Sequence, residues 1–175
     1  SLLHALVELS RQEALPPSIA LHINHGLHQD ATDWAAHCAA VASNLGVAFH
    51  ERVVSIYAGA SPEAQARDAR YSVFESFLAA GDVLLLGHHL DDQVETVLFR
   101  LIRGAGPSGL AGIPEMRPLG RGLLMRPLLG ITRDQIQNYA GSHELAHLHD
   151  GSNDDTRYDR NFLRHEVLPL IESRW

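Results

Sequence analysis

Lysine is absent from this chain of 175 residues, and all 14 of its basic residues are arginines. The absence excludes a Walker A phosphate loop and a catalytic lysine within these residues, because both need the lysine ammonium group. Cys38 is the single cysteine, so the chain contains no internal disulfide and no Cys-x-x-Cys motif. Such sparse use of cysteine fits a reducing cytoplasm, where we expect the protein to be found.

Long apolar runs are also lacking. No stretch approaches the roughly 20 residues of a membrane-spanning helix, so the sequence predicts no membrane segment. The formal net charge of -7 argues against a nucleic-acid binder that acts on its own. Residues 1–95 hold 4 arginines against 12 acidic residues, whereas residues 96–175 hold 10 against 9. An anionic partner is therefore expected to dock on the C-terminal half.

Apolar strands alternate with helical segments along the chain, which predicts an α/β fold with a doubly wound parallel sheet. Strand patterns occupy residues 19–26, 47–54, 83–86 and 123–129. Helical patterns begin at Ser1, which stands in an N-cap position, and recur over 30–45, 62–80, 90–103 and 158–175, with a capping box at 132–135. No repeat or linker interrupts them, so we expect residues 1–175 to form a single domain.

The most informative stretch is the apolar strand Val83–Leu86 with the polar residues that follow it. His88 and His89 end the strand, and the next helix carries Asp91, Asp92 and Glu95 in its first turns. Ligand sites of parallel sheets lie at the carboxyl ends of strands, and acids spaced i, i+3 or i, i+4 share a helix face. This face suits a cation or a ligand amine. The plainer alternative is that the aspartates only complement the helix N-terminus.

Six segments follow one another in a characteristic order. They are His22–Leu27, Glu63–Tyr71, Gly87–Thr96, Arg103–Gly112, Arg126–Leu129, and Asp150–Asn153 with Tyr158–Asn161. Together they resemble the N-terminal catalytic domain of the tRNA(Ile)-lysidine synthase family, an N-type ATP pyrophosphatase or PP-loop domain. The resemblance covers nearly the whole chain and implies a three-layer, Rossmann-like fold of the adenine nucleotide alpha hydrolase type.

In that family a phosphate loop written S-G-G-x-D-S precedes the first helix, and only its final serine corresponds to a residue here, Ser1. The resemblance therefore implies that the first strand and most of the loop are missing from residues 1–175, as are the C-terminal tRNA-binding regions. Because the backbone amides of such a loop hold phosphates, we expect the fragment alone to be inactive.

The resemblance implies a ligase that forms a carbon-nitrogen bond with ATP and Mg2+. It adenylates the C2 carbonyl oxygen of the wobble cytidine in the CAU anticodon of tRNA(Ile), and the amine of free L-lysine then displaces AMP to give lysidine. The expected partners are thus this tRNA and lysine, with no membrane, and a homodimer is left open.

The first step, adenylation, needs hydrogen-bond donors and positive charge around ATP. By resemblance, the ATP contacts are Ser1, Ile23, Asn24 and His88, with Ile23 and Asn24 near the adenine. Arg67 and Arg70, one helical turn apart, are catalytic candidates because arginine stabilises charge that builds on the α-phosphate. The alternative is that both arginines form surface ion pairs with Glu63 or Asp68.

For the second step, the transfer of lysine, the resemblance implies that Asp91, Asp92 and Glu95 are catalytic residues. We expect Asp92 and Glu95 to bind the lysine ammonium group, and Asp91 to lie closer to the metal and ATP. In the glycine-rich loop that follows, Gly104 and Gly106 are expected to allow movement over the site. Three residues near the C-terminus are expected to position substrate or the tRNA backbone, namely Arg160, Asn161 and Arg164. Alternatively, the two arginines pair with Asp159 or Glu166 on the helix surface.

Two other functions stay open. One is a metal-dependent phosphohydrolase with ligands from His22, His25, His28, His88, His89, Asp91 and Asp92. Strand residues at i and i+3 face opposite ways, so the first three histidines need a turn between them, which Gly26 allows. The other is a nucleotide-binding domain without enzymatic activity.

Overall fold

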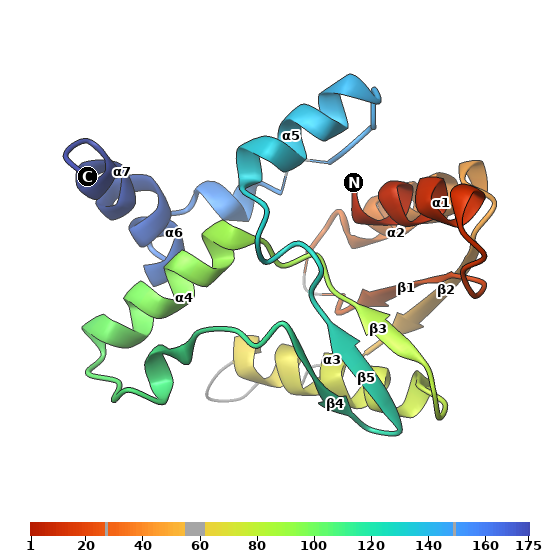
Figure 1. The fold of residues 1–175 in the computed structure, drawn as a ribbon, viewed down its shortest axis with the longest axis horizontal. Coiled ribbons are helices and arrows are strands. Elements are labelled where there is room, and N and C mark those ends of the chain that lie inside the picture. The colour runs from red at the N-terminus through yellow and green to blue at the C-terminus, as the bar shows by residue number, and fades with distance from the viewer. Residues whose placement is uncertain (27, 55–61, 149) are drawn as a thin grey trace. The chain divides into compact units, whose positions relative to one another are not determined.

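The computed structural model describes residues 1–26, 28–54, 62–148 and 150–175 (Figure 1). The chain divides into two compact units. Unit 1 contains Ser1–Leu84 and Pro118–Leu123, and unit 2 contains Leu85–Arg117 and Leu124–Trp175. The single domain expected over residues 1–175 stays a prediction, and the units are described separately.

Unit 1 is built on two parallel strands, β1 (Ile19–Asn24) and β2 (Ala48–Val53). The register places Ile19 opposite Ala48 and Asn24 opposite Val53. Parallel strands need a crossover connection, and α2 (Ala31–Asn44) supplies it. Both strands were predicted, and the structure shortens each by one or two residues at its ends.

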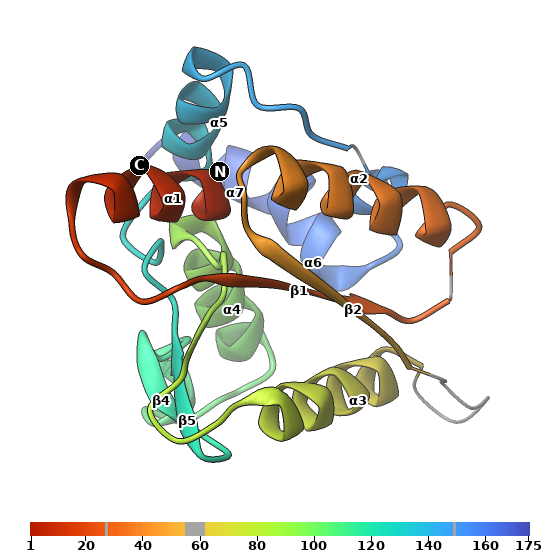
Figure 2. The same ribbon diagram turned by 90° about the vertical axis from the view of Figure 1, so that its right-hand side faces the viewer.

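Helices lie on both sides of this strand pair. Figures 1 and 2 show α1 (Leu2–Gln12) and α2 on one side of β1 and β2, and α3 (Pro62–Phe77) on the other. Ser1 is the N-cap of α1, as predicted. A parallel pair covered on both sides is the arrangement of a doubly wound α/β fold.

A second sheet has the strand order β3-β5-β4 and consists of β3 (Val83–Leu85), β4 (Met116–Leu119) and β5 (Gly122–Met125). The N–H of Leu123 donates to the carbonyl of Asp82 at 3.0 Å, and the N–H of Leu86 donates to Met125 at 2.9 Å. Since the partners advance together along both strands, β3 and β5 are parallel.

The predicted strand at 123–129 is wrong in its second half, and β4 was not predicted. The strand ends at Met125 because Pro127 has no N–H for a sheet ladder, and residues 126–129 close a turn in which Leu129 N–H donates to Arg126 O at 3.3 Å. Gly120, at φ +54°, forms the tight turn between β4 and β5.

The helices of unit 2 carry several of the predicted site residues. α4 (Leu90–Ile102) is contacted by α6 (Asp159–Phe162) and by the π-helix η3 (Leu163–Val167). The remaining elements are the short 3-10 helices η1 (Gly109–Ala111) and η2 (Gly151–Asp154), and the helices α5 (Arg133–Ser142) and α7 (Leu168–Glu172). The predicted capping box of α5, between Thr132 and Gln135, is confirmed.

The helix predicted over about 158–175 is helical from Asp159 to Glu172. It contains the wider turn of η3 between α6 and α7 and ends three residues before the predicted end. Pro169 lacks the N–H that would bond to the carbonyl four residues earlier, so the regular α-helical ladder cannot pass through this point.

The buried side chains of the described residues differ in kind between the units. In unit 1 they are apolar, namely Val7, Ala35, Ala42, Phe74, Leu78 and Leu119. In unit 2 the apolar Leu124 and Leu163 are accompanied by three buried polar residues, Glu95, Thr96 and Arg126. Burying a charged side chain is costly unless it has a partner, so the burial of Glu95 and Arg126 indicates that unit 2 contains paired polar groups at defined positions.

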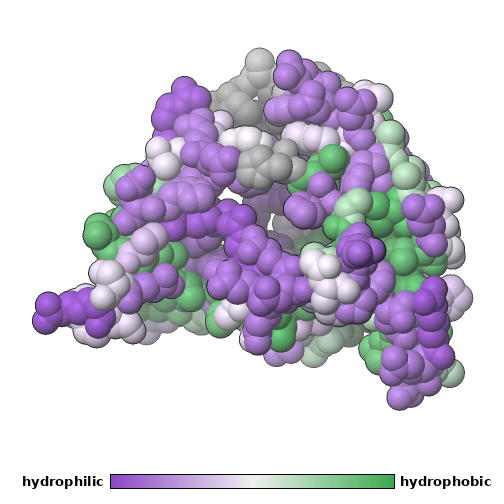
Figure 3. Space-filling model, turned by 90° about the horizontal axis from the view of Figure 1, so that it is seen from above, coloured by the Kyte–Doolittle hydropathy of each residue, from purple (hydrophilic) through white to green (hydrophobic). Residues whose placement is uncertain are grey.

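The described helices include none that is both long and apolar enough to cross a membrane. Figure 3 shows a face on which hydrophilic residues predominate, with hydrophobic residues in smaller groups between them.

Leu124 is fully buried, whereas its neighbour Leu123 in β5 is 38% exposed. We expect Leu124→Ala to lower the free energy of unfolding by about 2 to 5 kcal/mol, because it removes buried apolar surface and leaves a cavity. Leu123→Ala is the matched control and should cost less than about 1.5 kcal/mol. Urea unfolding of both variants measures the difference, and equal losses would show that the two faces of β5 are not packed as described.

Candidate active site

The predicted site residues fall in both units. Unit 1 contains Ser1, Ile23, Asn24, Arg67 and Arg70. Unit 2 contains His88, Asp91, Asp92, Glu95, Gly104, Gly106, Arg160, Asn161 and Arg164.

In unit 1, β1 ends at Asn24 in a turn made by this side chain. Its Oδ1 accepts the N–H of Gly26 at 2.9 Å, and its Nδ2 donates to Glu51 Oε1 at 3.0 Å. Gly26 has φ +61°, a conformation that favours glycine. Because the Asn24 side chain is engaged in the turn, a ligand at this strand end would meet the backbone, in keeping with the contact expected for Ile23 and Asn24.

Positive charge lies near the end of β1. Burial, together with the charges of Arg70 and His22, lowers the pKa of His25 from its ordinary value. Partial desolvation and the neighbouring Arg67 lower the pKa of Arg70, against the opposing effect of Tyr71. A partly desolvated guanidinium is suited to binding an anion.

The alternative role of the two arginines, as members of surface ion pairs, finds little support in the described side chains. Arg67 lies over the ring of Tyr71, with 5.4 Å from Cζ to the ring centroid. Neither Arg67 nor Arg70 forms an ion pair with Asp68 in the described structure, and the side chain of Glu63 lies outside the described residues. Ser1 accepts the N–H of Ala5 through its carbonyl at 2.9 Å and makes no capping bond with its hydroxyl.

In unit 2, the first turn of α4 uses both aspartates. Asp92 Oδ2 accepts the N–H of His89 at 2.9 Å in a capping box, so the helix-capping alternative is correct for one oxygen of this residue. Asp91 Oδ2 accepts the N–H of Arg133 at 2.9 Å and ties the start of α5 to α4. The side chains of Asp91 and Asp92 are 40% and 22% exposed, so both remain accessible to a ligand.

The third acid, Glu95, is only 2% exposed and is paired with Arg164. Arg164 Nε donates to Glu95 Oε1 at 2.6 Å, and Arg164 Nη2 lies 3.9 Å from Asp92 Oδ1. The sequence placed Arg164 with a tRNA contact and the acids with a substrate amine. The structure instead brings the Arg164 guanidinium to the two acids, although Arg164 lies 69 positions after Glu95 in the chain.

Arg160 and Asn161, the other two positioning candidates, differ in environment. Arg160 is exposed and pairs with neither Asp159 nor Glu166 in the described structure. Asn161 Nδ2 donates to the carbonyls of Ser152 at 2.8 Å and Asp155 at 3.0 Å, so it holds the preceding loop. A role for either in substrate binding stays a prediction.

The glycine-rich loop is fixed to α4 at its second half. Gln93 Nε2 donates to Ile113 O at 3.0 Å, and Ile113 N–H donates to Gln93 Oε1. Arg100 Nη1 donates to the carbonyls of Gly109 and Gly112, both at 2.9 Å. We call these four bonds the loop clasp. Movement of the loop around Gly104 and Gly106 stays a prediction, and the clasp holds the second half of the loop against α4.

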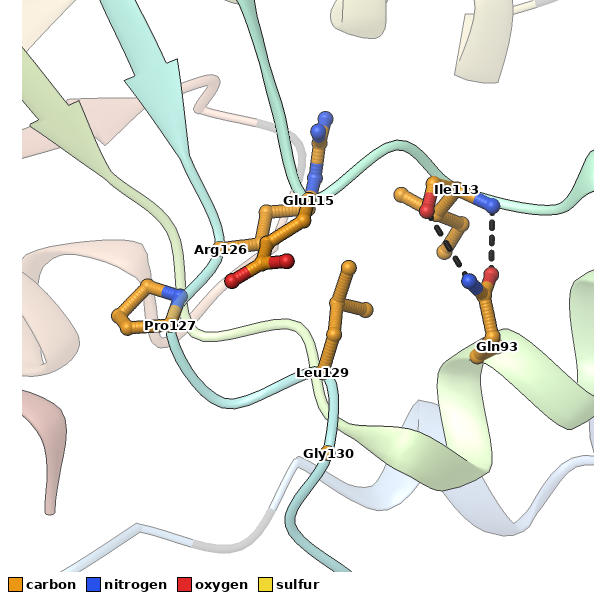
Figure 4. Close-up of a pocket in the computed structure, with 7 residues that line it drawn as sticks. All are labelled: Gln93, Ile113, Glu115, Arg126, Pro127, Leu129 and Gly130. Carbon is orange, nitrogen blue, oxygen red and sulfur yellow. Dashed lines mark hydrogen bonds between the residues drawn. The ribbon is translucent and has the colours of Figure 1, made fainter.

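A cavity of about 440 Å³ lies beside the loop clasp in unit 2 (Figure 4). Its lining consists of Gln93, Ile113, Glu115, Arg126, Pro127, Leu129 and Gly130. Figure 4 shows the Gln93 amide bonded to the Ile113 backbone at one side of it. Arg126, which is 4% exposed, donates from Nη1 to the carbonyl of Pro114 at 2.7 Å. This cavity was not predicted, because its lining comes from three separate segments, at 93, 113–115 and 126–130.

A metal centre built by protein ligands alone is not seen. Among the described residues, no group of three or more histidine, cysteine, aspartate and glutamate side chains is placed to hold a metal ion. The phosphohydrolase alternative therefore has no geometric support there. Mg2+ bound with a nucleotide needs only one or two protein carboxylates, since phosphate and water supply the other ligands. Asp91 fits this need because its Oδ1 has no hydrogen-bond partner among the described residues.

The chain matches the PP-loop domain family over residues 1–171 and belongs to that family. It is 51% identical over 174 residues to the tRNA(Ile)-lysidine synthase of Pseudomonas aeruginosa, covering 99% of this chain and 39% of that protein. The enzyme of the same name from Coxiella burnetii is 46% identical over 176 residues, again covering 99% and 39%. The chain thus spans 39% of the length of these curated relatives.

Among solved structures, the chain is similar to the U34-tRNA thiolase NcsA from Methanococcus maripaludis with its [4Fe-4S] cluster. The TM-score is 0.63 at 17% sequence identity, and the match covers 99% of this chain and 68% of that chain. At this identity the likeness concerns the fold alone. The predicted family and the predicted α/β fold are confirmed.

Gly112 has φ +71°, and a Cβ there would lie 2.5 Å from Gln93 Oε1. We expect Gly112→Ala to disrupt the loop clasp and to destabilise the chain by about 1 to 3 kcal/mol through backbone strain. Gly106→Ala is the matched control in the same loop, because a Cβ there meets nothing within 4 Å. Limited proteolysis within residues 104–113, together with urea unfolding, should separate the two variants. Equal cleavage rates would contradict the clasp.

The pKa of His25 offers a test of its neighbourhood. We expect Arg70→Gln to raise this pKa partway toward 6.5, since burial still acts when the arginine charge is gone. Because the folded-state pKa is lowered, His25 contributes stability above the unfolded pKa, and this contribution is lost as pH falls below about 6.5. NMR titration of the His25 ring protons measures the shift. Arg52→Gln in the same unit is the control and should leave it unchanged.

Proposed function

We propose that this chain is the ATP-using catalytic part of a tRNA(Ile)-lysidine synthase. The observation that carries the proposal is the cluster of three carboxylates at the start of α4, in a chain about half identical to enzymes of that name. The cytidine C2 carbonyl oxygen attacks the α-phosphorus of ATP and pyrophosphate leaves. The side-chain amine of lysine then forms the C2–N bond, and AMP departs with the oxygen.

Unit 1 supplies the groups proposed for ATP. The backbone at Ile23 and Asn24 receives the adenine, and Ser1 lies at the N-terminus of α1, where backbone N–H groups favour phosphate. Arg67 and Arg70 donate to the α-phosphate, where negative charge builds during adenylation. His88, half-buried in the segment between β3 and α4, is proposed as an ATP contact from the resemblance alone.

Unit 2 supplies the groups proposed for lysine and metal. Asp92 and Glu95 give the site the negative charge that receives the lysine ammonium, and Asp92 is the more accessible of the two. Asp91 holds Mg2+, which when bound neutralises charge on the phosphates. A carboxylate near the amine also accepts the proton that lysine must lose before it becomes a nucleophile.

The partners proposed are tRNA(Ile) with a CAU anticodon and free L-lysine, in the cytoplasm, with a homodimer as a further possibility. The exposed Arg160 and the first half of the glycine loop, at Gly104 and Gly106, are the proposed tRNA contacts in this chain. Asn161 contributes by holding the loop at 152–155.

The proposal is tested by separating the two half-reactions in the complete protein. We expect Asp91→Asn to abolish transfer of AMP to the tRNA, because the metal site is lost. Asp92→Asn should leave this transfer intact and raise the KM for lysine about 10- to 100-fold, the loss expected for one charged hydrogen bond. Radiolabelled ATP and lysine follow the two steps. Normal lysine KM in Asp92→Asn, or no lysine incorporation by the wild type, would contradict the proposal.

A further inference from the structure

We propose that Glu95 acts by holding Arg164 away from Asp92, and that Asp92 alone takes the lysine ammonium. This inference rests on the proposed function and divides the roles of two acids that the sequence treats as a pair. Glu95 becomes a positioning residue, and the residue that contacts substrate is Asp92.

The first step is the burial of Glu95. At 2% exposed, its carboxylate has lost almost all contact with water, and a buried carboxylate needs a paired cation. Arg164 supplies that cation through Nε at 2.6 Å, a short charge-assisted hydrogen bond. A substrate ammonium would have to displace this partner to reach Glu95.

Asp92, Glu95 and Arg164 form a cluster with an unbalanced charge. Two carboxylates and one guanidinium leave one net negative charge, which one ammonium ion neutralises. Asp92 is the acid left for it, because its Oδ1 lies 3.9 Å from Arg164 Nη2, beyond a direct hydrogen bond, and its side chain is 22% exposed. Without Glu95, the guanidinium is free to move toward Asp92 and compete with the substrate.

The segment that carries Arg164 is fixed by hydrogen bonds on both sides of this residue. It lies in the wider turn of η3, directly after Leu163, which is 4% exposed. On one side Asn161 bonds the carbonyls of Ser152 and Asp155, and on the other His165 Nε2 lies 3.0 Å from the carbonyl of Asn153. The backbone at Arg164 is thus tied on both sides, and π-turns of this kind often occur at functional sites.

The test is a double-mutant comparison in the complete protein, with the KM for lysine as the readout. We expect Glu95→Gln to raise this KM at least tenfold, because Arg164 then competes for Asp92. Adding Arg164→Gln should restore the KM to within about threefold of wild type, since the competing cation is gone. Asp92→Asn should not be rescued in this way. If the double variant remains as impaired as Glu95→Gln, Glu95 contacts the ammonium directly and the inference is wrong.

Two further measurements keep the result interpretable. Glu8→Gln with Arg11→Gln removes an exposed ion pair on α1 and should leave the lysine KM unchanged. If Glu95→Gln fails to fold, Arg164→Lys is the milder variant, because it keeps the charge but loses the Nε contact; an unchanged lysine KM there overturns the inference. A wild-type protein that does not incorporate lysine refutes the proposed function itself, whereas an active wild type with no rescue refutes only this inference.

Discussion

The ion pair between Glu95 and Arg164 is the constraint on which the candidate lysine site depends. A carboxylate that is 2% exposed needs a paired cation to offset the cost of its burial, so the position of α4 requires that the turn at η3 bring a guanidinium to it. Removing one member leaves an uncompensated charge, which costs more than removing both. The packing of the last helices against α4 is therefore also an electrostatic requirement, and stability and site geometry cannot be varied independently here.

α4 presents different residues to different partners around its circumference. Its first turn offers Asp91 and Asp92, one turn later Glu95 meets Arg164, and a further side carries Gln93 and Arg100, which fix the glycine loop. Residues three or four apart share a face, while residues one or two apart do not, so a single helix can serve substrate, helix packing and loop anchoring at once. The orientation of the loop follows from the same helix that carries the acids.

Local patterns in the sequence predicted what is encoded locally. Ser1 as an N-cap, the capping box at Thr132 and the strand that leads into Asp91 and Asp92 were all visible from spacing and residue type. The partner of Glu95 was not, because the two residues are 69 positions apart and the spacing of residues along one helix carries no information about a contact between helices. The loop clasp was also missed, because the Gln93 and Arg100 side chains in it bond backbone groups 9 to 20 positions away that carry no residue-specific signal.

Arginine rather than lysine at position 164 has a chemical consequence under the proposed function. A guanidinium bonds one carboxylate through Nε while its Nη groups face another, which an ammonium on a flexible stem does less well. It also keeps its proton at any physiological pH. A lysine there would place a second primary amine, chemically the same as the substrate's, beside an activated cytidine. All 14 basic residues of this chain are arginines, so under the proposed function none of its side chains offers a primary amine that would compete with the substrate.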